Sequence, residues 1–133
     1  MSEERAVTGK ARTHKELDVW KQSMSLAKEA YELTKGFPKE EMYGLVSQIR
    51  RAAVSVPSNI AEGAARNSDK EFTQFLSVSL GSLAELETQI LLSRELGFLK
   101  DNGIDGSIER TRKMLLGLIR HLRGKGKMKR AVQ

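Results

Sequence analysis

Residues 68–96 read SDKEFTQFLSVSLGSLAELETQILLSREL, and this stretch has the clearest helix boundary in the chain. It opens with a capping box, in which the Ser68 hydroxyl and the Glu71 carboxylate each satisfy a backbone donor of the first helical turn. Apolar residues then recur at spacings of three and four, the period of an α-helix with one buried face. Gly97 follows as the C-terminal cap. The stretch therefore predicts a helix about 40 Å long.

Three more segments have the same apolar period, and none has a sustained period of two. They cover residues 17–35, 39–63 and 104–122. In the first, Trp20, Met24 and Tyr31 are expected on a broad buried face, with Gly36 as a left-handed cap. Pro57 is expected to kink the second, because proline lacks a backbone donor. Short connections between the four segments predict an all-α, up-down-up-down antiparallel four-helix bundle with helix 2 kinked near Pro57.

The length and composition predict one domain in a reducing compartment. The chain has 133 residues, enough for one core, and contains no cysteine. Neither a secretory signal nor a run of membrane-spanning length is present in the sequence, so we expect a cytoplasmic protein with no membrane contact. The expected organisation is a flexible N-terminal segment at residues 1–14, the bundle at 15–123 and a basic flexible tail at 124–133.

Positive charge is concentrated at one end of the chain. The formal net charge is +6 and the sequence pI is about 9.7, but no acidic residue follows Glu109. A polyanion should be attracted to this end. Because no aromatic residue follows Phe98, contacts should involve the nucleic-acid backbone with weak sequence preference. The alternative is that these cations only keep the protein soluble. The candidate nucleic-acid-binding residues are Arg110, Lys113, Arg120, Arg123, Lys125, Lys127, Lys129 and Arg130.

The helix predicted at residues 68–96 has a second apolar surface outside its core line. Small residues line up there, and two larger apolar residues lie where a monomeric bundle would carry charge. We expect this surface to be an oligomer interface, although scattered exposed apolar residues are the plainer interpretation. The candidate interface residues are Ser77, Val78, Gly81, Ala84, Thr88 and Leu92.

No pattern in the chain predicts a catalytic or metal site. A di-iron bundle needs glutamate and histidine three residues apart, and neither His14 nor His121 has such a partner. Glu85 and Glu87 point about 200° apart around a helix, so they cannot form a paired acid site. The sequence therefore predicts a protein that is not an enzyme and has no metal or cofactor.

Two short motif matches are chance occurrences. Ser25 and Lys28 have the spacing of a serine–lysine nucleophile pair, but the accompanying motifs are missing. The glycines of residues 124–127 lack the spacing and flanking elements of a phosphate loop. An enzyme would remain possible only if Arg50, Glu62 and Arg66 converged around a pocket, for example between subunits. These three could equally form a buried or interfacial ion-pair set.

Residues 37–66 contain several short motifs in a fixed order. FPKEE at 37–41 is followed by YGL at 43–45, QIRRAA at 48–53 and VPSNIAEG at 56–63. This series closely resembles the four-helix-bundle family named for ribosomal RNA intervening sequences. The resemblance continues upstream through LDVW at 17–20 and downstream to about residue 122. We interpret the motif from Pro57 to Gly63 as architectural, with Ser58 and Asn59 bonding freed carbonyls and Gly63 ending the helix.

The resemblance implies a bacterial bundle that assembles into a homopentamer, is sometimes encoded within large-subunit ribosomal RNA genes, and has no enzyme activity. The family is also similar in architecture to the accessory variability determinant of diversity-generating retroelements, which binds nucleic acid and a reverse transcriptase. The leading hypothesis is therefore a non-enzymatic homo-oligomeric accessory protein that binds RNA or DNA, with a reverse transcriptase as a candidate partner. The alternative is a structural or protein-interaction scaffold that does not bind nucleic acid.

Overall fold

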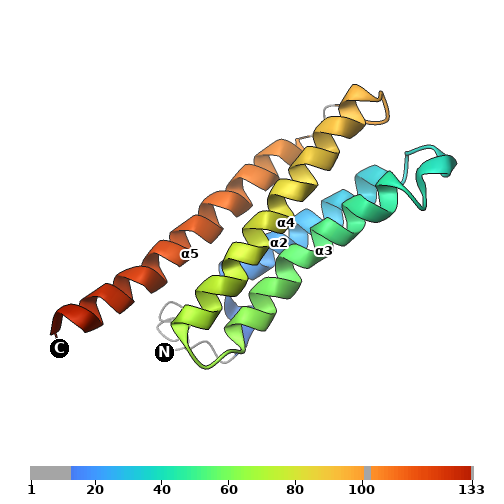
Figure 1. Cartoon of the computed structure of the whole chain (residues 1–133). Helices are drawn as coiled ribbons and strands as arrows, with labels where there is room; N and C mark the ends of the chain where they lie inside the picture. The colour runs from blue at the N-terminus through green and yellow to red at the C-terminus, as the bar shows by residue number, and fades with distance from the viewer. Residues whose placement is uncertain (1–12, 101–102, 133) are drawn as a thin grey trace.

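The computed structural model describes residues 13–100 and 103–132, and for residues 127–132 it describes the backbone alone (Figure 1). The predicted flexible segment at residues 1–14 lies almost entirely outside this part of the chain. All regular elements in the described ranges are helical. In chain order they are η1 (His14–Glu16), α2 (Asp18–Thr34), η2 (Lys39–Glu41), α3 (Leu45–Ala64), α4 (Asp69–Glu95) and α5 (Ile104–Val132).

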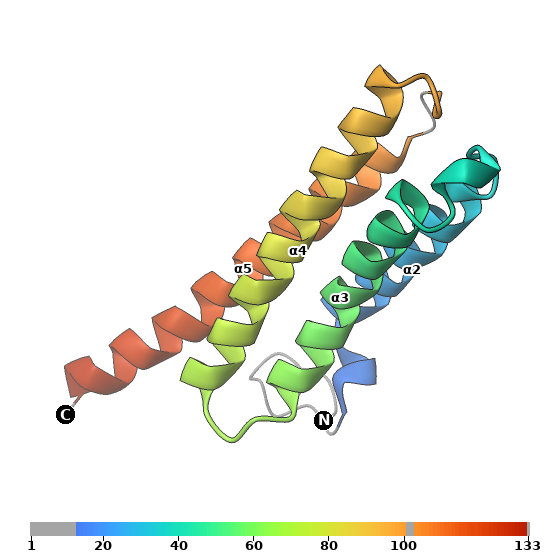
Figure 2. The same cartoon turned by 45° about the vertical axis from the view of Figure 1, so that its right-hand side comes forward.

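The four long helices form an all-α bundle, as predicted. Each of them packs against two others, in the cyclic order α2, α3, α4 and α5, as Figures 1 and 2 show. Ser55 Oγ bonds Ser82 Oγ, and Ser79 Oγ donates to the carbonyl of Val56, so the later residue of α3 pairs with the earlier residue of α4. The two helices therefore run in opposite directions at this contact. The largest side chains with no exposed surface come from all four helices and include Leu26, Ile49, Leu83 and Leu115. The core therefore runs along the axis of the bundle.

Local sequence signals fix several helix ends as predicted. The backbone N–H of Glu71 donates to Ser68 Oγ at 3.2 Å, which confirms the N-terminal cap of α4. Gly97 has φ +80° after the end of α4, as its role as C-terminal cap requires. Gly36 does not have a positive φ, because Gly97 and Gly103 are the glycines with positive φ among the described residues. The left-handed cap predicted at Gly36 is therefore wrong.

The second predicted helix begins later than its sequence indicated. Residues 39–41 form the separate turn η2, and α3 starts at Leu45, whose N–H donates to Glu41 Oε1 at 3.4 Å. The α-helix continues through Pro57 to Ala64, and the kink near Pro57 stays a prediction. Asn59 Nδ2 donates to the carbonyl of Ser55 at 2.8 Å, one turn earlier in the same helix.

Gly63 is a packing residue and does not end the helix as expected. It is buried inside α3, where a Cβ would lie 2.7 Å from Phe75 Cβ and 2.9 Å from Phe72 Cδ1 of α4. Real side chains do not tolerate such distances without a shift of their neighbours. The absence of a side chain at Gly63 therefore lets α3 and α4 approach closely at this end of the bundle.

The last helix is longer than the sequence predicted. Gly124 and Gly126 were expected to end it, but α5 continues to Val132 and its last turns project beyond the turn that joins α3 and α4 (Figures 1 and 2). A helical glycine costs only about 1 kcal/mol relative to alanine, and the surrounding lysines and arginines are good helix formers. The helix end expected at Gly124 is therefore wrong, and residues 124–132 extend α5.

Candidate nucleic-acid interface

The predicted basic residues lie mainly on the outer surface of α5. Arg110, Lys113 and Arg120 are exposed, whereas Ile108, Thr111, Leu115 and Leu122 of the same helix are buried. At about 100° per residue, the three cations project from the side of α5 that faces away from the buried seam. The structure therefore brings these three residues together on one face of the bundle.

These cations are not neutralised by acidic neighbours. Among the described residues, no ion pair or hydrogen bond involves the side chain of Arg110, Lys113, Arg120 or Arg123. Arg112 provides a contrast, because it bonds Glu87 of α4 at 2.6 Å and Glu109 of its own helix. Arg112 therefore has a structural role at the α4–α5 contact, whereas the charges of the other four residues are available to a ligand.

The basic residues at the end of α5 differ in their surroundings. Lys125 is half-buried and its Nζ lies 3.0 Å from Asp69 Oδ2, in the first turn of α4. Its charge is therefore partly compensated inside the chain, unlike that of Arg123. Lys127, Lys129 and Arg130 belong to the helical backbone of α5, but their side chains lie outside the described part of the chain.

Three glycines lie on the same face as the exposed cations, and the sequence reasoning missed them. We define the basic face as Gly106, Arg110, Lys113, Gly117, Arg120 and Gly124. Its members alternate at spacings of four and three, so this signal was present in the sequence. A Cβ added at any of the three glycines would meet nothing within 4 Å. The fold does not require glycine there, although each costs stability in a helix.

The basic face has the chemistry of a backbone contact. Arginine and lysine donate charged hydrogen bonds to phosphate oxygens, and the intervening glycines leave the helix backbone accessible to a bulky chain. The described part of α5 carries no Phe, Tyr or Trp on which a base could stack. Such a surface can bind phosphates without reading base identity.

The candidate interface residues of α4 are all exposed. Val78 is 51% exposed and Leu92 is 47% exposed, and the helix position of Gly81 has open space around it. Ser77, Ala84 and Thr88 lie on the same outer side of α4. We define the α4 face as Ser77, Val78, Gly81, Ala84, Thr88 and Leu92. Whether a second chain covers it stays a prediction.

An apolar groove between α2 and α3 is a second surface that the sequence reasoning missed. It has a volume of about 790 Å³, and its lining includes Trp20, Met24, Tyr31, Val54, Pro57 and Ala61. Met24 and Tyr31 were expected in the core but are 46% and 41% exposed. They lie at the boundary between the buried face and the solvent-exposed face of α2.

The remaining polar candidates have separate structural partners. Arg50 binds the C-terminal end of α2, where its Nη2 donates to the carbonyl of Tyr31 at 3.3 Å and its Cζ lies 4.6 Å from the Tyr31 ring centroid. Glu62 and Arg66 form an ion pair at 2.9 Å on the surface of α3 and the turn after it. Arg50, Glu62 and Arg66 therefore do not form one ion-pair set within the chain. The described residues contain no cluster of three or more metal-ligating side chains.

A comparison with family models decides the relationship of the chain. The model of the 23S rRNA-intervening sequence protein matches residues 15–118. This chain belongs to that family. The match covers α2, α3, α4 and the first half of α5, so the resemblance seen in residues 37–66 is confirmed.

The description of the 23S rRNA-intervening sequence protein family connects it with ribosomal RNA, and the family is not a known enzyme family. Arg110 and Lys113 lie inside the matched region, whereas Arg120 and Arg123 lie beyond it. No curated protein matches the chain. In this member of the family, the basic face therefore begins inside the matched region and extends beyond it.

Proposed function

We propose that this chain is a non-enzymatic, homo-oligomeric accessory protein that binds the phosphate backbone of RNA or DNA through the basic face of α5. One observation carries the proposal: Arg110, Lys113 and Arg120 are exposed together and have no acidic partner among the described residues. The family's connection with ribosomal RNA supports a nucleic-acid ligand.

The electrostatics favour a polyanion over a single small anion. Arg110 and Arg120 are separated by about 15 Å along the helix, so they would contact phosphates in different parts of a strand. Binding would release the counterions condensed on those phosphates, and the affinity would fall steeply with salt. A pocket for one phosphate would need converging donors, which this extended row does not provide.

A homo-oligomer would strengthen this weak site. One copy offers a few phosphate contacts, and linking several copies raises the effective concentration of the remaining sites once the first has bound. The homopentamer and a reverse transcriptase partner belong to this proposal through the family resemblance. Cytoplasmic location stays a prediction.

Membrane insertion does not belong to the proposal. Among the described helices, α4 has the length and apolar content of a weak candidate membrane span. However, α4 contributes Phe72, Leu76, Leu83, Leu86 and Ile90 to the core of the bundle. The helix would have to leave that core in order to enter a bilayer. Packing inside the bundle already explains why these five residues are apolar.

Fluorescence anisotropy with RNA and DNA of equal length at two salt concentrations tests the proposal. We expect salt-dependent binding of the wild type. Substituting Arg110, Lys113 and Arg120 by glutamine should weaken binding of all sequences and flatten the salt slope by up to about 0.9 for each phosphate that is no longer neutralised. The matched control substitutes Lys15, Lys21 and Lys39, which are exposed elsewhere, and should bind like the wild type. Absent or salt-independent binding contradicts the proposal.

A protein-interaction scaffold is the second candidate function. The exposed α4 face and the α2–α3 groove favour it, because both are apolar surfaces outside the basic face. A scaffold would retain its protein contacts in the triple glutamine variant and would not bind either nucleic acid.

A further inference from the structure

Helix α4 is more apolar than its own packing requires. It has the length and apolar content of a membrane-spanning helix, yet only 39% of its most apolar window of 18 residues is buried inside the chain. Val78, Leu91 and Leu92 are each about half exposed. A helix in contact with water on its outer side normally carries polar residues there, so these three half-exposed apolar side chains favour a surface that a partner covers.

The α2–α3 groove has a shape that complements the α4 face. The groove is edged by the large side chains of Trp20, Met24 and Tyr31. The α4 face is small at its centre, where a Cβ added at Gly81 would meet no atom of the chain within 4 Å and Ala84 follows one turn later. Small side chains let one helix approach the backbone of another closely. Large residues of the groove edge can therefore pack against the centre of the α4 face.

The charges beside the two surfaces are opposite. Lys28 lies in the lining of the groove, and Arg51 lines its continuation along α3. Glu85 and Glu95 are exposed next to the α4 face. None of these four side chains forms an ion pair or hydrogen bond among the described residues. The groove side therefore carries two unpaired cations and the outer side of α4 two unpaired carboxylates, with Lys70 exposed at the beginning of α4.

Both surfaces are accessible at the same time on one chain. The groove lies between α2 and α3, and α4 packs against α3 and α5, so the outer side of α4 points away from the groove. Neither surface includes the basic face of α5. One copy can therefore use its groove and its α4 face together while α5 remains exposed to solvent.

We infer that a second copy of this chain places its α4 face in the α2–α3 groove, with Glu85 and Glu95 of one copy near Lys28 and Arg51 of the other. The two surfaces differ, so the contact is heterologous and repeats from copy to copy until a ring closes. The inference rests on the homo-oligomer of the proposed function and is independent of nucleic-acid binding.

Two variants, each blocked on one surface, test this arrangement. Met24→Glu with Val54→Glu places acid in the groove, and Gly81→Arg with Ala84→Arg places bulk and positive charge on the α4 face. All four positions are exposed, so the helices should form normally, which circular dichroism checks. Gly117→Arg is the matched control, because it adds the same side chain at another helical glycine with open space.

The mass of each protein is then measured by light scattering during size exclusion. We expect an oligomer for the wild type and for Gly117→Arg, and a monomer for each blocked variant alone. An equimolar mixture of the two blocked variants should form dimers, because each retains the surface that the other lacks. A monomeric wild type, a blocked variant of wild-type mass, or a mixture that stays monomeric would overturn the inference.

Charge reversal gives a second measurement. Arg51→Glu should lower the mass at low protein concentration, and adding Glu85→Arg to the same chain should restore it. A double variant whose mass is lower than that of Arg51→Glu alone and of Glu85→Arg alone would overturn the pairing. Anisotropy of the wild type separates the two ideas. Absence of salt-dependent binding with an intact oligomer contradicts the nucleic-acid part of the proposed function, whereas binding by a monomer contradicts the inference and the homo-oligomer on which it rests.

Discussion

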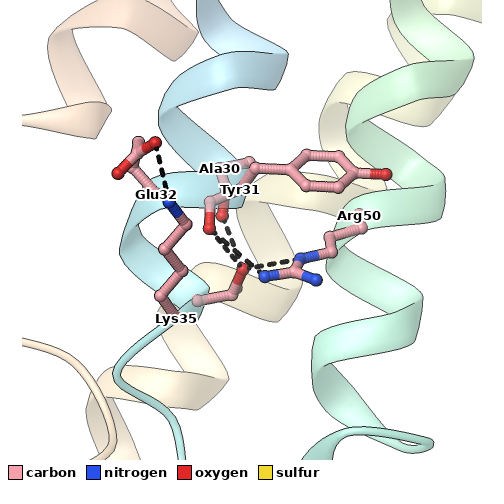
Figure 3. Close-up of polar contacts among 6 residues, drawn as sticks. Ala30, Tyr31, Glu32, Lys35 and Arg50 are labelled. Atoms are coloured by element: carbon pink, nitrogen blue, oxygen red, sulfur yellow. Dashed lines mark hydrogen bonds and ion pairs between the residues drawn. The ribbon is translucent and has the colours of Figure 1, made fainter.

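Arg50 Nε of α3 donates a hydrogen bond to Thr34 Oγ1, the buried hydroxyl in the last turn of α2, at 2.9 Å. The same hydroxyl donates to the carbonyl of Ala30 at 2.8 Å, and Figure 3 shows the guanidinium beneath the Tyr31 side chain at this helix end. The last carbonyls of a helix have no partner within it, and a cation there also favours the helix dipole. Arg50 therefore joins α3 to the end of α2.

Replacing Arg50 by methionine should destabilise the bundle. The change removes hydrogen bonds to Thr34 and Tyr31 and a cation–π contact while keeping the aliphatic part of the side chain. We expect a loss of about 1 to 2 kcal/mol in the free energy of unfolding. Urea denaturation followed by circular dichroism measures it. Lys21→Met, at an exposed position of α2 outside the proposed contacts, should change the free energy by less than about 0.5 kcal/mol. Equal effects at the two positions would show that Arg50 has no special role.

Gly63→Ala should destabilise the chain, whereas Gly124→Ala should stabilise it. A Cβ at Gly63 meets Phe75 Cβ at 2.7 Å, and overpacking of this kind costs about 1 to 3 kcal/mol. At Gly124 a Cβ meets nothing within 4 Å, so the gain in helix propensity of up to about 1 kcal/mol dominates. Thermal melts of the two variants should shift in opposite directions. A shift of the same sign would contradict this account of Gly63.

Gly117→Leu should weaken nucleic-acid binding without weakening the fold. Leucine is a better helix former than glycine and has open space at this position, but it would cover the helix backbone between Lys113 and Arg120. Anisotropy should show a lower affinity together with a higher melting temperature. Gly117→Ala is the conservative control, with a similar gain in stability and binding close to the wild type. Unchanged affinity for the leucine variant would mean that the ligand does not approach this part of α5.

Asp69→Asn should increase the affinity for nucleic acid. Asp69 lies 3.0 Å from Lys125 Nζ, so its carboxylate both compensates that lysine and repels phosphate. Removing its charge should tighten binding at low salt, and the difference should shrink as salt rises. Asp105→Asn makes the same charge change at the opposite end of α5, in the first turn, where the acid pairs with Arg94 at 2.9 Å. A gain of the same size for both variants would indicate net charge alone.

Local chemistry made much of the fold predictable. The cap at Ser68, the glycine cap at Gly97 and the buried positions of Leu76, Leu83 and Ile90 follow from residues close in sequence. The outward position of Arg110, Lys113 and Arg120 follows from the same helical period. These features need no knowledge of what packs against the helix.

The features that could not be predicted depend on contacts between distant residues. The close approach at Gly63 requires Phe72 and Phe75 of the next helix, and the bond from Arg50 requires the end of α2. Lys125 was grouped with the other basic residues, because its partner Asp69 is more than fifty positions earlier in the chain. The glycines of the basic face were the exception, since their spacing was available and was interpreted only as a helix end.

Helix α5 runs past the end of the bundle that carries the turn between α3 and α4 (Figure 2). In a ring with a single rotation axis that runs along the bundles, every copy would send this helix out at the same pole. Such a particle would have one strongly cationic rim and one nearly neutral rim, and a bound polyanion would distinguish its top from its bottom. Nucleic acid would then load from a single direction, which leaves the opposite pole free for a protein.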